Sequence, residues 1–212
     1  YLSLHKMVSI NLINPVNHGF LMDYFSELGH PEQKIKYLKS KGDLQPIIKG
    51  WYLFNSIDRN YSKLHIANLL YGPSYVSGVS VLSYLGLIAD RADSVQSMVF
   101  KRGKTLITKL GAYYYNHIPK EIFYTGILNF EISDKITCLM ANATKALYDN
   151  ILITPGLEFS GKDDLLNYLE EDLRFDVERL GELDVELLEL LLLKGRKKRQ
   201  TRILLQLVKK SK

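Results

Sequence analysis

Cysteine is almost absent from the sequence: Cys138 is the only one in 212 residues. A single cysteine excludes an internal disulfide, and sparse cysteine is typical of proteins that stay in a reducing compartment. We therefore expect a cytoplasmic protein. Because Cys138 stands in the largely apolar stretch "DKITCLMANA", we interpret it as a buried thiol and not as a nucleophile.

Long apolar runs are also missing. No stretch reaches the roughly 18 apolar residues that a membrane-spanning helix needs, so no membrane association is expected. The first residues, "YLSLHKMVSINLINPVNHG", lack the basic stretch, apolar block and small-residue cleavage site of a secretory signal. The content of 46% hydrophobic and 24% charged residues is ordinary for a folded globular protein.

Metal-ligand spacings are lacking as well. The five histidines form no HxxxH or HExxH pattern and have no cysteine companions, so neither a metal nor another cofactor is predicted. His117 is interpreted as a structural histidine at a strand end, because the sequence places no acid or nucleophile beside it. Five acids are interpreted as solvated helix faces, since nothing puts two of them in one apolar pocket: Asp163, Asp164, Glu170, Glu171 and Asp172. We predict no catalytic residue and expect the protein not to be an enzyme.

A phosphate-binding loop is the first possibility raised by "YGPSYVSGVSVLSYLGLI", residues 71–88. A P-loop requires G-x-x-x-x-G-K-[ST], but Gly72 and Gly78 are one residue too far apart and no lysine follows. The stretch instead predicts a corner followed by a short helix, with Ser74 or Ser77 as N-cap and Gly86 after its end.

Charge is unevenly distributed along this basic chain, whose net charge is +5 and whose pI is about 9.1. Residues 31–41 carry four lysines and one glutamate, and residues 194–212 carry nine bases and no acid. Between them, residues 158–193 hold twelve acids and three bases. A polyanion would therefore find two separate basic regions.

The first sixty residues predict a winged helix-turn-helix. "GFLMDYFSELG" has apolar residues at helical spacing and ends at Gly29, and a second helix begins at Pro31 and ends at Gly42. Two short strands, 44–48 and 51–54, follow around the turn Lys49-Gly50. In helix-turn-helix proteins the second helix lies in the major groove.

The candidate DNA-binding residues lie on this second helix and on the hairpin turn. Gln33, Lys34 and Tyr37 are predicted to reach base edges or nearby phosphates. Four lysines are predicted to contact phosphates: Lys36, Lys39, Lys41 and Lys49. The alternative is that these lysines form an ordinary solvated helix face, although that alternative does not predict a basic turn directly downstream.

The rest of the chain predicts a larger mixed domain, so the expected fold is α+β with domains 1–60 and 61–212. Short β-branched and aromatic segments from about 95 to 140 predict an antiparallel sheet of four or five strands. Residues 142–212 predict a helix capped by Asn142 and then three leucine-rich helices. The basic block "GRKKRQTR" could balance the acidic helices, contact a polyanion or be a localisation-like tract of no consequence, and we favour charge balance with some affinity for RNA or DNA.

Several motifs in order resemble the AbiEi family of antitoxins from bacterial abortive-infection (type IV) toxin–antitoxin systems. They are the helix-and-wing segment "KIKYLKSKGDLQPIIKGWYLF", the segment "YGPSYVSGVSVLSYLGLI", the strand region "FKRGKTLITKLGAYYYNHIPKEIFYTGI" and the helix "MANATKALYDNI". In the last motif the family's "A-x-x-x-K-A-L-x-D" pattern is carried by Lys145, Ala146, Leu147 and Asp149. The resemblance runs from about residue 19 to 149 and is looser beyond.

The resemblance implies an antitoxin that is also a transcriptional autorepressor. Family members bind operator DNA through the N-terminal winged domain, and their C-terminal domain counters a nucleotidyltransferase-like toxin without an obligatory stable complex. The segment 71–88 would then be a hinge between the two halves. The residues that neutralise the toxin are not predicted.

Two alternatives remain at this point. The protein could be an interaction module whose acidic helices, within residues 163–189, bind a basic partner without sequence-specific DNA recognition. It could also be a nuclease-like or nucleotide-modifying enzyme that uses His117 or Lys145, although no metal-ligand cluster supports this.

Overall fold

The N-terminal unit combines two helices with a small sheet. The computed structural model describes residues 15–55, 61–90, 93–133 and 136–212. The elements of this unit, in chain order, are strand β1 (Val16–Asn17), helix α2 (His18–Tyr24), the 3₁₀ turn η1 (Ser26–Leu28), helix α3 (Pro31–Lys41) and strands β2 (Leu44–Ile48) and β3 (Trp51–Phe54). The predicted second helix and both hairpin strands are confirmed at their bounds.

Caps and special backbone conformations set the ends of these helices. The Asn17 side chain accepts a hydrogen bond from the Phe20 backbone N–H at 2.7 Å and so caps α2. Gly29 (φ 71°) and Gly42 (φ 79°) adopt the left-handed conformation at the ends of η1 and α3. Pro31 occupies the start of α3, as predicted, where its missing N–H costs no helical hydrogen bond.

The three-stranded sheet lies between two hydrophobic cores. Its order is β1-β3-β2, and all neighbours are antiparallel. The smaller core joins this sheet to α2 and α3 and comprises Val16, Leu21, Phe25, Ile35, Leu38, Leu44, Tyr52 and Phe54. Ile47 and Leu53 of the same hairpin belong instead to the larger core of the protein. The predicted boundary near residues 55–62 overlaps residues 56–60, which lie outside the described residues.

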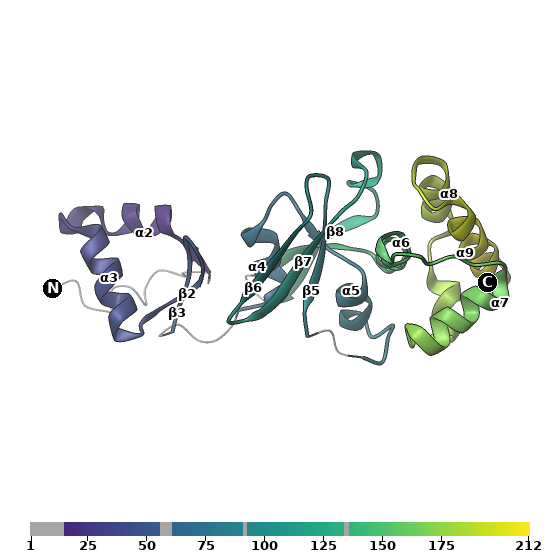
Figure 1. The fold of residues 1–212 in the computed structure, drawn as a ribbon, viewed down its shortest axis with the longest axis horizontal. Coiled ribbons are helices and arrows are strands. Elements are labelled where there is room, and N and C mark those ends of the chain that lie inside the picture. Colours follow the sequence, from purple (N-terminus) through teal and green to yellow (C-terminus); the bar gives the residue numbers. More distant parts are fainter. Residues whose placement is uncertain (1–14, 56–60, 91–92, 134–135) are drawn as a thin grey trace.

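The larger unit is built on a six-stranded sheet with the order β6-β7-β5-β4-β9-β8. Helix α4 and short helix α5 pack against it (Figure 1). Its elements are α4 (Lys63–Leu70), β4 (Tyr75–Val76), α5 (Val79–Tyr84), β5 (Val95–Val99), β6 (Lys104–Thr108), β7 (Gly111–His117), the 3₁₀ turn η2 (Lys120–Ile122), β8 (Ile127–Ser133) and β9 (Ile136–Ala141).

This sheet is mixed, so the prediction of an antiparallel sheet over 95–140 is wrong in part. The β6–β7 and β8–β9 hairpins are antiparallel as expected, but β5 pairs with β7 in parallel and β4 pairs with β9 in parallel. The chain leaves β5, forms the edge strand β6 and returns as β7 beside β5. Such a crossover depends on packing between distant segments, which local strand patterns do not reveal.

The segment 71–88 is a central part of this sheet and not only a corner. Its strand β4 lies between β5 and β9, with Tyr75 and Val76 fully buried, which contradicts a hinge between two halves. Neither predicted serine caps α5. The N-cap is Gly78 (φ 58°), and the Gln96 side chain accepts the Val79 backbone N–H at 3.1 Å. Gly86 (φ 65°) follows the helix end, as predicted.

The C-terminal helices pack on one end of the sheet unit, with helix α6 between them and the strands (Figure 1). Helix α6 comprises Ala143–Ile153. The elements after it are α7 (Lys162–Asn167) continued by the π-helical turn η3 (Tyr168–Asp172), the 3₁₀ segment η4 (Val177–Glu182), α8 (Val185–Lys194) and α9 (Lys198–Lys210). Asn142 caps α6 as predicted, accepting the Lys145 backbone N–H at 2.8 Å. The three leucine-rich helices are also present, the first of them broken by the π turn.

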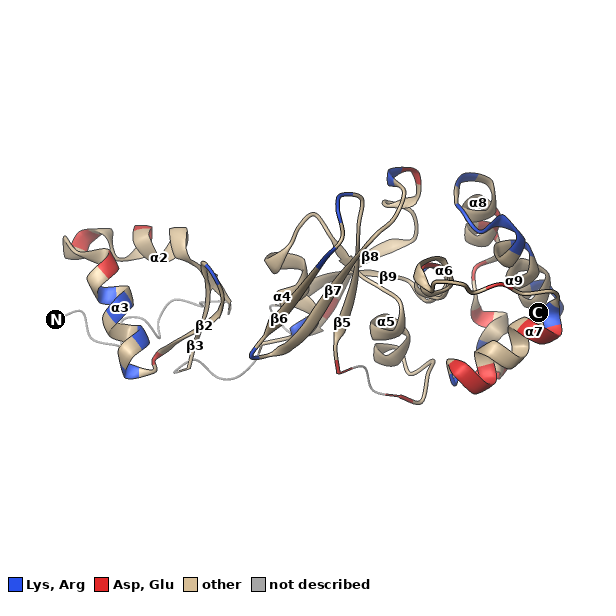
Figure 2. Ribbon diagram, in the orientation of Figure 1, with Lys and Arg blue, Asp and Glu red and all other residues tan. Residues whose placement is uncertain are grey.

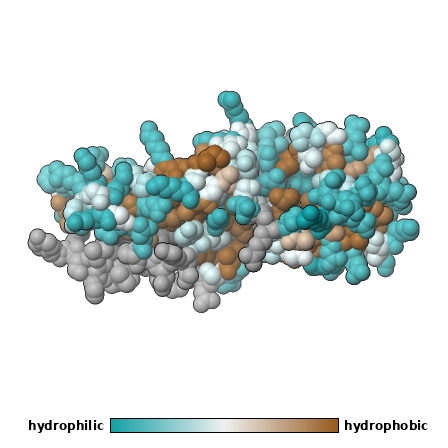
Figure 3. Space-filling model, turned by 60° about the horizontal axis from the view of Figure 1, so that its bottom comes forward, coloured by the Kyte–Doolittle hydropathy of each residue, from teal (hydrophilic) through white to brown (hydrophobic). Residues whose placement is uncertain are grey.

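Figure 3 shows apolar residues, in brown, reaching the surface of one face in the middle and in the right-hand part of the molecule. Large hydrophobic residues that are exposed include Ile107 and Tyr114 of the β6–β7 hairpin and Leu128 of the edge strand β8. Among the described residues, no helix combines the length and apolarity needed to cross a bilayer.

Candidate nucleic-acid interface

The outward face of α3 is polar and accessible. Ile35 and Leu38 are buried in the smaller core, which leaves Gln33, Lys36 and Tyr37 exposed on the opposite side of the helix. Tyr37 has 52% of its surface exposed although it is a large aromatic residue. These side chains point away from the smaller core, and their contact with DNA remains a prediction.

Two lysines flank the exposed tyrosine. The Lys34 Nζ lies 5.4 Å and the Lys41 Nζ 5.9 Å from the centre of the Tyr37 ring. Positions i, i+3 and i+7 share one side of a helix, so Lys34, Tyr37 and Lys41 form a row. An aromatic ring between two cations offers a stacking surface next to charges that attract phosphate.

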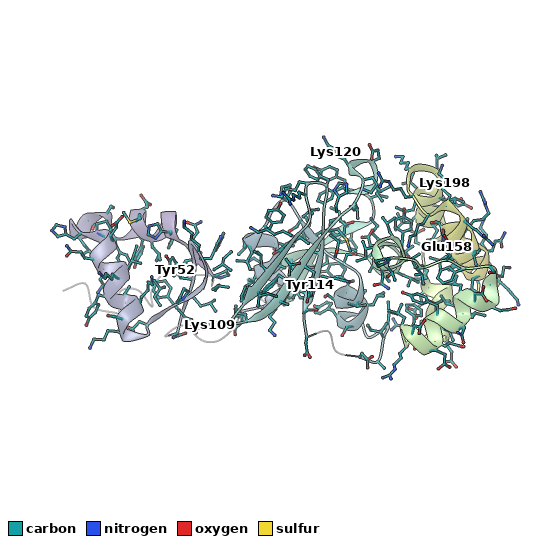
Figure 4. All side chains as sticks on the ribbon, viewed as in Figure 1. Tyr52, Lys109, Tyr114, Lys120, Glu158 and Lys198 are labelled. Atoms are coloured by element: carbon teal, nitrogen blue, oxygen red, sulfur yellow. The ribbon has the colours of Figure 1, made fainter. Side chains whose placement is uncertain are left out.

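Lys39 occupies a different side of the helix. Its Nζ lies 5.8 Å from the ring of Tyr52, a residue of β3 whose place in the N-terminal unit is labelled in Figure 4. Lys36 is exposed between these two sides. The basic residues of α3 therefore spread over most of its solvent-facing half.

The hairpin turn carries the remaining predicted residue, Lys49, which is exposed. Gly50 (φ 84°) makes this tight turn possible, and its carbonyl accepts the His18 backbone N–H at 2.8 Å. The turn therefore lies beside the start of α2. In Figure 2 the blue segment of the turn is separate from the blue segments of α3.

Charges in this unit are not neutralised by ion pairs. In the part of the chain that the structure describes, none of Lys34, Lys36, Lys39, Lys41 and Lys49 pairs with a carboxylate. Lys39 and Lys41 in the last turn also interact favourably with the helix dipole, by about 0.3–1 kcal/mol each. That structural role accounts for their position but does not explain the half-buried Lys34 or the exposed Lys36.

A buried polar cluster in the larger unit was not identified as such from the sequence. Lys145 and Asp149, one turn apart on α6, form an ion pair of 2.5 Å, and both side chains have no exposed surface. The second carboxylate oxygen of Asp149 accepts hydrogen bonds from the hydroxyls of Tyr75 and Ser77, each at 2.8 Å. A lysine and an aspartate four residues apart on a helix of largely apolar residues are the signal that could have indicated this cluster.

The cluster fixes two elements relative to each other. Tyr75 lies on β4 and Ser77 directly follows it, so the carboxylate joins this segment to α6. Burial, and then the charge of Asp149, raise the pKa of Tyr75 well above its usual value, so the hydroxyl remains a donor. Because Lys145 is enclosed and its ammonium is held by Asp149, the geometry gives it no contact with a substrate.

The other residues considered for chemistry are placed apart from each other. His117 lies at the exposed end of β7, and its Nδ1 is 3.1 Å from the Lys101 carbonyl. Cys138 is buried as predicted, and burial raises its thiol pKa to about 12. Among the described residues, no group of three histidine, cysteine, aspartate or glutamate side chains could hold a metal ion.

The acids of α7 and η3 are exposed, as predicted for solvated helix faces: Asp163, Asp164, Glu170, Glu171 and Asp172. One ion pair joins α8 and α9 outside the basic block, where the Lys209 Nζ of α9 lies 2.6 Å from a carboxylate oxygen of Glu189 on α8. Within the described chain, the bases of the block 196–202 form no ion pair.

Comparison with models of known protein families gives no match, and no curated protein matches the chain at a significant level. The function is therefore argued from the residues and geometry given above.

Proposed function

We propose that the N-terminal unit is a winged helix-turn-helix and that the protein binds operator DNA through α3. The order of α2, a sharp turn at Gly29, α3 and an antiparallel hairpin supports this assignment, as does the pairing of β1 with β3. In helix-turn-helix proteins the second helix enters the major groove. The observation that carries the proposal is the exposed basic and aromatic face of α3, whose lysines pair with no described carboxylate.

Different residues would carry sequence preference and affinity. Gln33 and Tyr37 lie at the centre of the exposed face, where Lys34 flanks them, so these three are assigned to base edges and nearby phosphates. Lys36, Lys39, Lys41 and Lys49 are assigned to phosphates. If about four phosphates are neutralised, log affinity falls with log salt with a slope of about −4 for each bound protomer.

The hairpin would be a short wing. Its tight turn projects Lys49, while Ile47 and Leu53 are buried against the larger core. The wing therefore contributes one cation and cannot wrap around the duplex.

On the resemblance of the ordered motifs, we also propose that the protein is the antitoxin of a two-gene toxin–antitoxin operon and represses that operon. Its larger unit would counter a nucleotidyltransferase-like toxin. Co-expression of the protein with the product of the neighbouring gene tests this role: growth restored by the full chain is expected. Continued growth arrest, with both proteins soluble, would contradict it.

DNA binding is tested by fluorescence anisotropy with the DNA upstream of the protein's own gene. We expect tight binding, a clear excess over scrambled DNA, and its loss in a Lys34→Glu/Lys36→Glu/Lys39→Glu variant. These three reversals take the net charge from +5 to −1. The matched control is Arg202→Glu/Lys210→Glu/Lys212→Glu, which makes the same change in exposed residues near the C-terminus.

The control separates local contacts from overall charge. If both variants lose binding equally, long-range attraction and not α3 is responsible. Equal weak binding of the unchanged protein to all DNA would contradict sequence-specific recognition.

A second candidate function is supported by the acidic surface of α7 and η3. None of its five exposed acids pairs with a base among the described residues, so the surface is free to attract a basic protein. In this alternative the protein neutralises its partner by direct binding. Co-purification that is lost on Glu170→Lys/Glu171→Lys, with DNA binding absent, would favour it over the autorepressor.

A further inference from the structure

A pocket of about 360 Å³ lies between the sheet and the C-terminal helices. Its walls come from three places in the chain: the end of β7 with His117 and Pro119, the end of α6 with Leu152 and Ile153, and the α8–α9 connection with Arg196 and Lys197. No DNA-binding residue proposed above lines it. Its volume is at the lower end of the range for small-molecule sites, about 300–1,000 Å³.

The α8–α9 connection presents cations in a fixed backbone geometry. The buried Tyr148 hydroxyl accepts the Arg196 backbone N–H at 3.2 Å and donates to the Arg196 carbonyl at 3.3 Å. Lys197 adopts the left-handed conformation (φ 49°), and its Nζ donates to the Ile151 and Thr154 carbonyls at 2.9 and 2.7 Å. The backbone of Arg196 is thus held in place while its guanidinium is exposed and, in the described part of the chain, has no side-chain partner.

Lys197 keeps one ammonium N–H beyond its two backbone contacts. Burial lowers the pKa of Lys197, and the charge of Glu158 partly opposes this effect. A phosphate oxygen at the pocket would accept this N–H and receive charge-assisted hydrogen bonds from the Arg196 fork.

Further cations lie in neighbouring segments but do not line the pocket, and two of them have contacts elsewhere: the Lys101 Nζ donates to the Gly72 carbonyl and lies 3.8 Å from the centre of the Tyr71 ring, and the Lys120 Nζ lies 5.8 Å from the centre of the Phe100 ring. Lys101 and Arg102 lie in the β5–β6 turn, Lys120 lies in η2, and Lys198 begins α9. Figure 4 labels Lys120 and Lys198 along the upper edge of the molecule. The positive charges of Arg196 and Lys197 in the lining raise the local concentration of an anion.

The lining also has three apolar residues, beside the polar side chain of Asn116. Leu152, Ile153 and Pro119 supply no hydrogen-bonding side chain, so they suit a flat ring and not a second charged group. The His117 ring stands at the same rim. Because a carbonyl only accepts, its Nδ1 must donate to the Lys101 carbonyl, which leaves Nε2 as an acceptor for a hydroxyl when the ring is neutral.

We propose that this pocket binds a nucleoside phosphate, with the phosphate on Arg196 and Lys197 and the base against Leu152, Ile153 and Pro119. The ligand would be a free nucleotide or the terminal nucleotide of an RNA chain. The site is independent of DNA binding by α3, and either can be present without the other.

Isothermal titration calorimetry of the full chain with ADP, GDP, CDP and UDP tests the proposal. At least one of them is expected to bind, and adenosine and inorganic phosphate are expected to bind at least about tenfold more weakly, because each fills only one wall. A 5′-phosphorylated RNA trinucleotide distinguishes the two sources: tighter binding than the diphosphate indicates an RNA end, and weaker binding indicates a free nucleotide.

Arg196→Ala is expected to weaken nucleotide binding about tenfold or more, since it removes a charge-assisted fork. Arg202→Ala removes the same side chain from an exposed position on α9 outside the pocket and is expected to leave binding unchanged. His117→Ala is a second test at the opposite rim. The α3 triple variant is expected to bind nucleotide normally.

The proposal is overturned if no nucleoside diphosphate binds at millimolar concentration. It is also overturned if inorganic phosphate binds as tightly as the nucleotides, or if Arg196→Ala and Arg202→Ala bind alike. Circular dichroism of Arg196→Ala establishes that the variant is folded, which is expected because only its backbone contacts Tyr148.

Discussion

At the scale of single residues, the buried Lys145–Asp149 pair joins α6 to the segment of β4. Both charges are withdrawn from water, and Asp149 also receives two hydroxyl hydrogen bonds. Such a cluster contributes little net free energy when complete, because desolvation offsets attraction, but it becomes costly when one member is removed.

Replacing either partner alone is therefore expected to destabilise the protein strongly. Asp149→Asn leaves the Lys145 ammonium buried without a counter-charge, and Lys145→Met leaves a buried carboxylate, so each should lower the free energy of unfolding by about 3–5 kcal/mol. The double variant Lys145→Met/Asp149→Leu should lose less than the sum of the two. Urea denaturation of the unchanged protein, the two single variants and the double variant gives the four free energies of unfolding. Strictly additive losses would show that the pair is not coupled.

Buried ionisable groups also set the behaviour of the protein in alkali. Burial raises the pKa of Cys138 from 9.0 and that of Tyr148 from 10.0, each to about 12. A group whose pKa is raised by folding stabilises the native state fully below its unfolded pKa, and this contribution is lost as pH rises toward the folded value. Stability should therefore fall between about pH 9 and 12.

The Tyr148→Phe variant should show a shallower alkaline decline, because a two-unit shift corresponds to about 2–3 kcal/mol. Urea melts between pH 8 and 11 measure the difference in slope. Tyr124→Phe, at a position 62% exposed, is the control and should keep the slope of the unchanged protein. Identical slopes in all three proteins would refute the assignment to Tyr148.

At the scale of elements, the contact between α6 and the α8–α9 connection leaves no room for a side chain at Gly195. A Cβ there would lie 2.0 Å from the Tyr148 hydroxyl oxygen and 2.6 Å from the Leu191 carbonyl. Gly195→Ala should cost about 1–3 kcal/mol through overpacking.

Removal of the Tyr148 hydroxyl should relieve part of this clash. In a Tyr148→Phe background the nearest aromatic carbon is 3.0 Å away, so Gly195→Ala should cost less there than in the unchanged protein. Thermal unfolding of the four variants gives the coupling energy. A cost that does not depend on residue 148 would place the strain at Leu191 alone.

Elements whose signals are local were predictable, and their arrangement was not. Pro31, Gly42 and Asn142 act within one helical turn, so the helix ends that they set follow from the sequence. The exposed face of α3 follows from the spacing of Ile35 and Leu38. Strand order was missed because β6 lies at the sheet edge while β5 and β7 pair in parallel.

The buried cluster was missed for the same physical reason. Ser77 and Asp149 are 72 residues apart in the chain and meet only when β4 lies beside α6. A pattern search within a window of about 18 residues has no access to such a pair. By contrast, the outward side of α3 could be predicted from the sequence, because it depends only on which residues of one helix face one core.

At the scale of the whole molecule, the β2–β3 hairpin belongs to both cores. Leu44 is fully buried in the smaller core, and Leu53, on the neighbouring strand, is buried in the larger one. Truncating each should cost about 2–5 kcal/mol locally, but the regions affected should differ.

Hydrogen exchange followed by mass spectrometry separates the two effects. Leu44→Ala should reduce protection in α2 and α3 only, whereas Leu53→Ala should also reduce it in α4 and β4. If both variants affect the same amides, the two cores unfold as one cooperative unit.

Helix α6 has eight consecutive buried residues, from Thr144 to Ile151, because it lies between the sheet and the C-terminal helices (Figure 1). An ordinary surface helix such as α3 keeps one side free to vary, which gives a saturation-mutagenesis profile a period of 3.6 residues. Along α6 the profile should lack this 3.6-residue period. Most substitutions should be deleterious at every position from 144 to 151. The polar residues Thr144 and Asn150 should tolerate as few substitutions as Leu147.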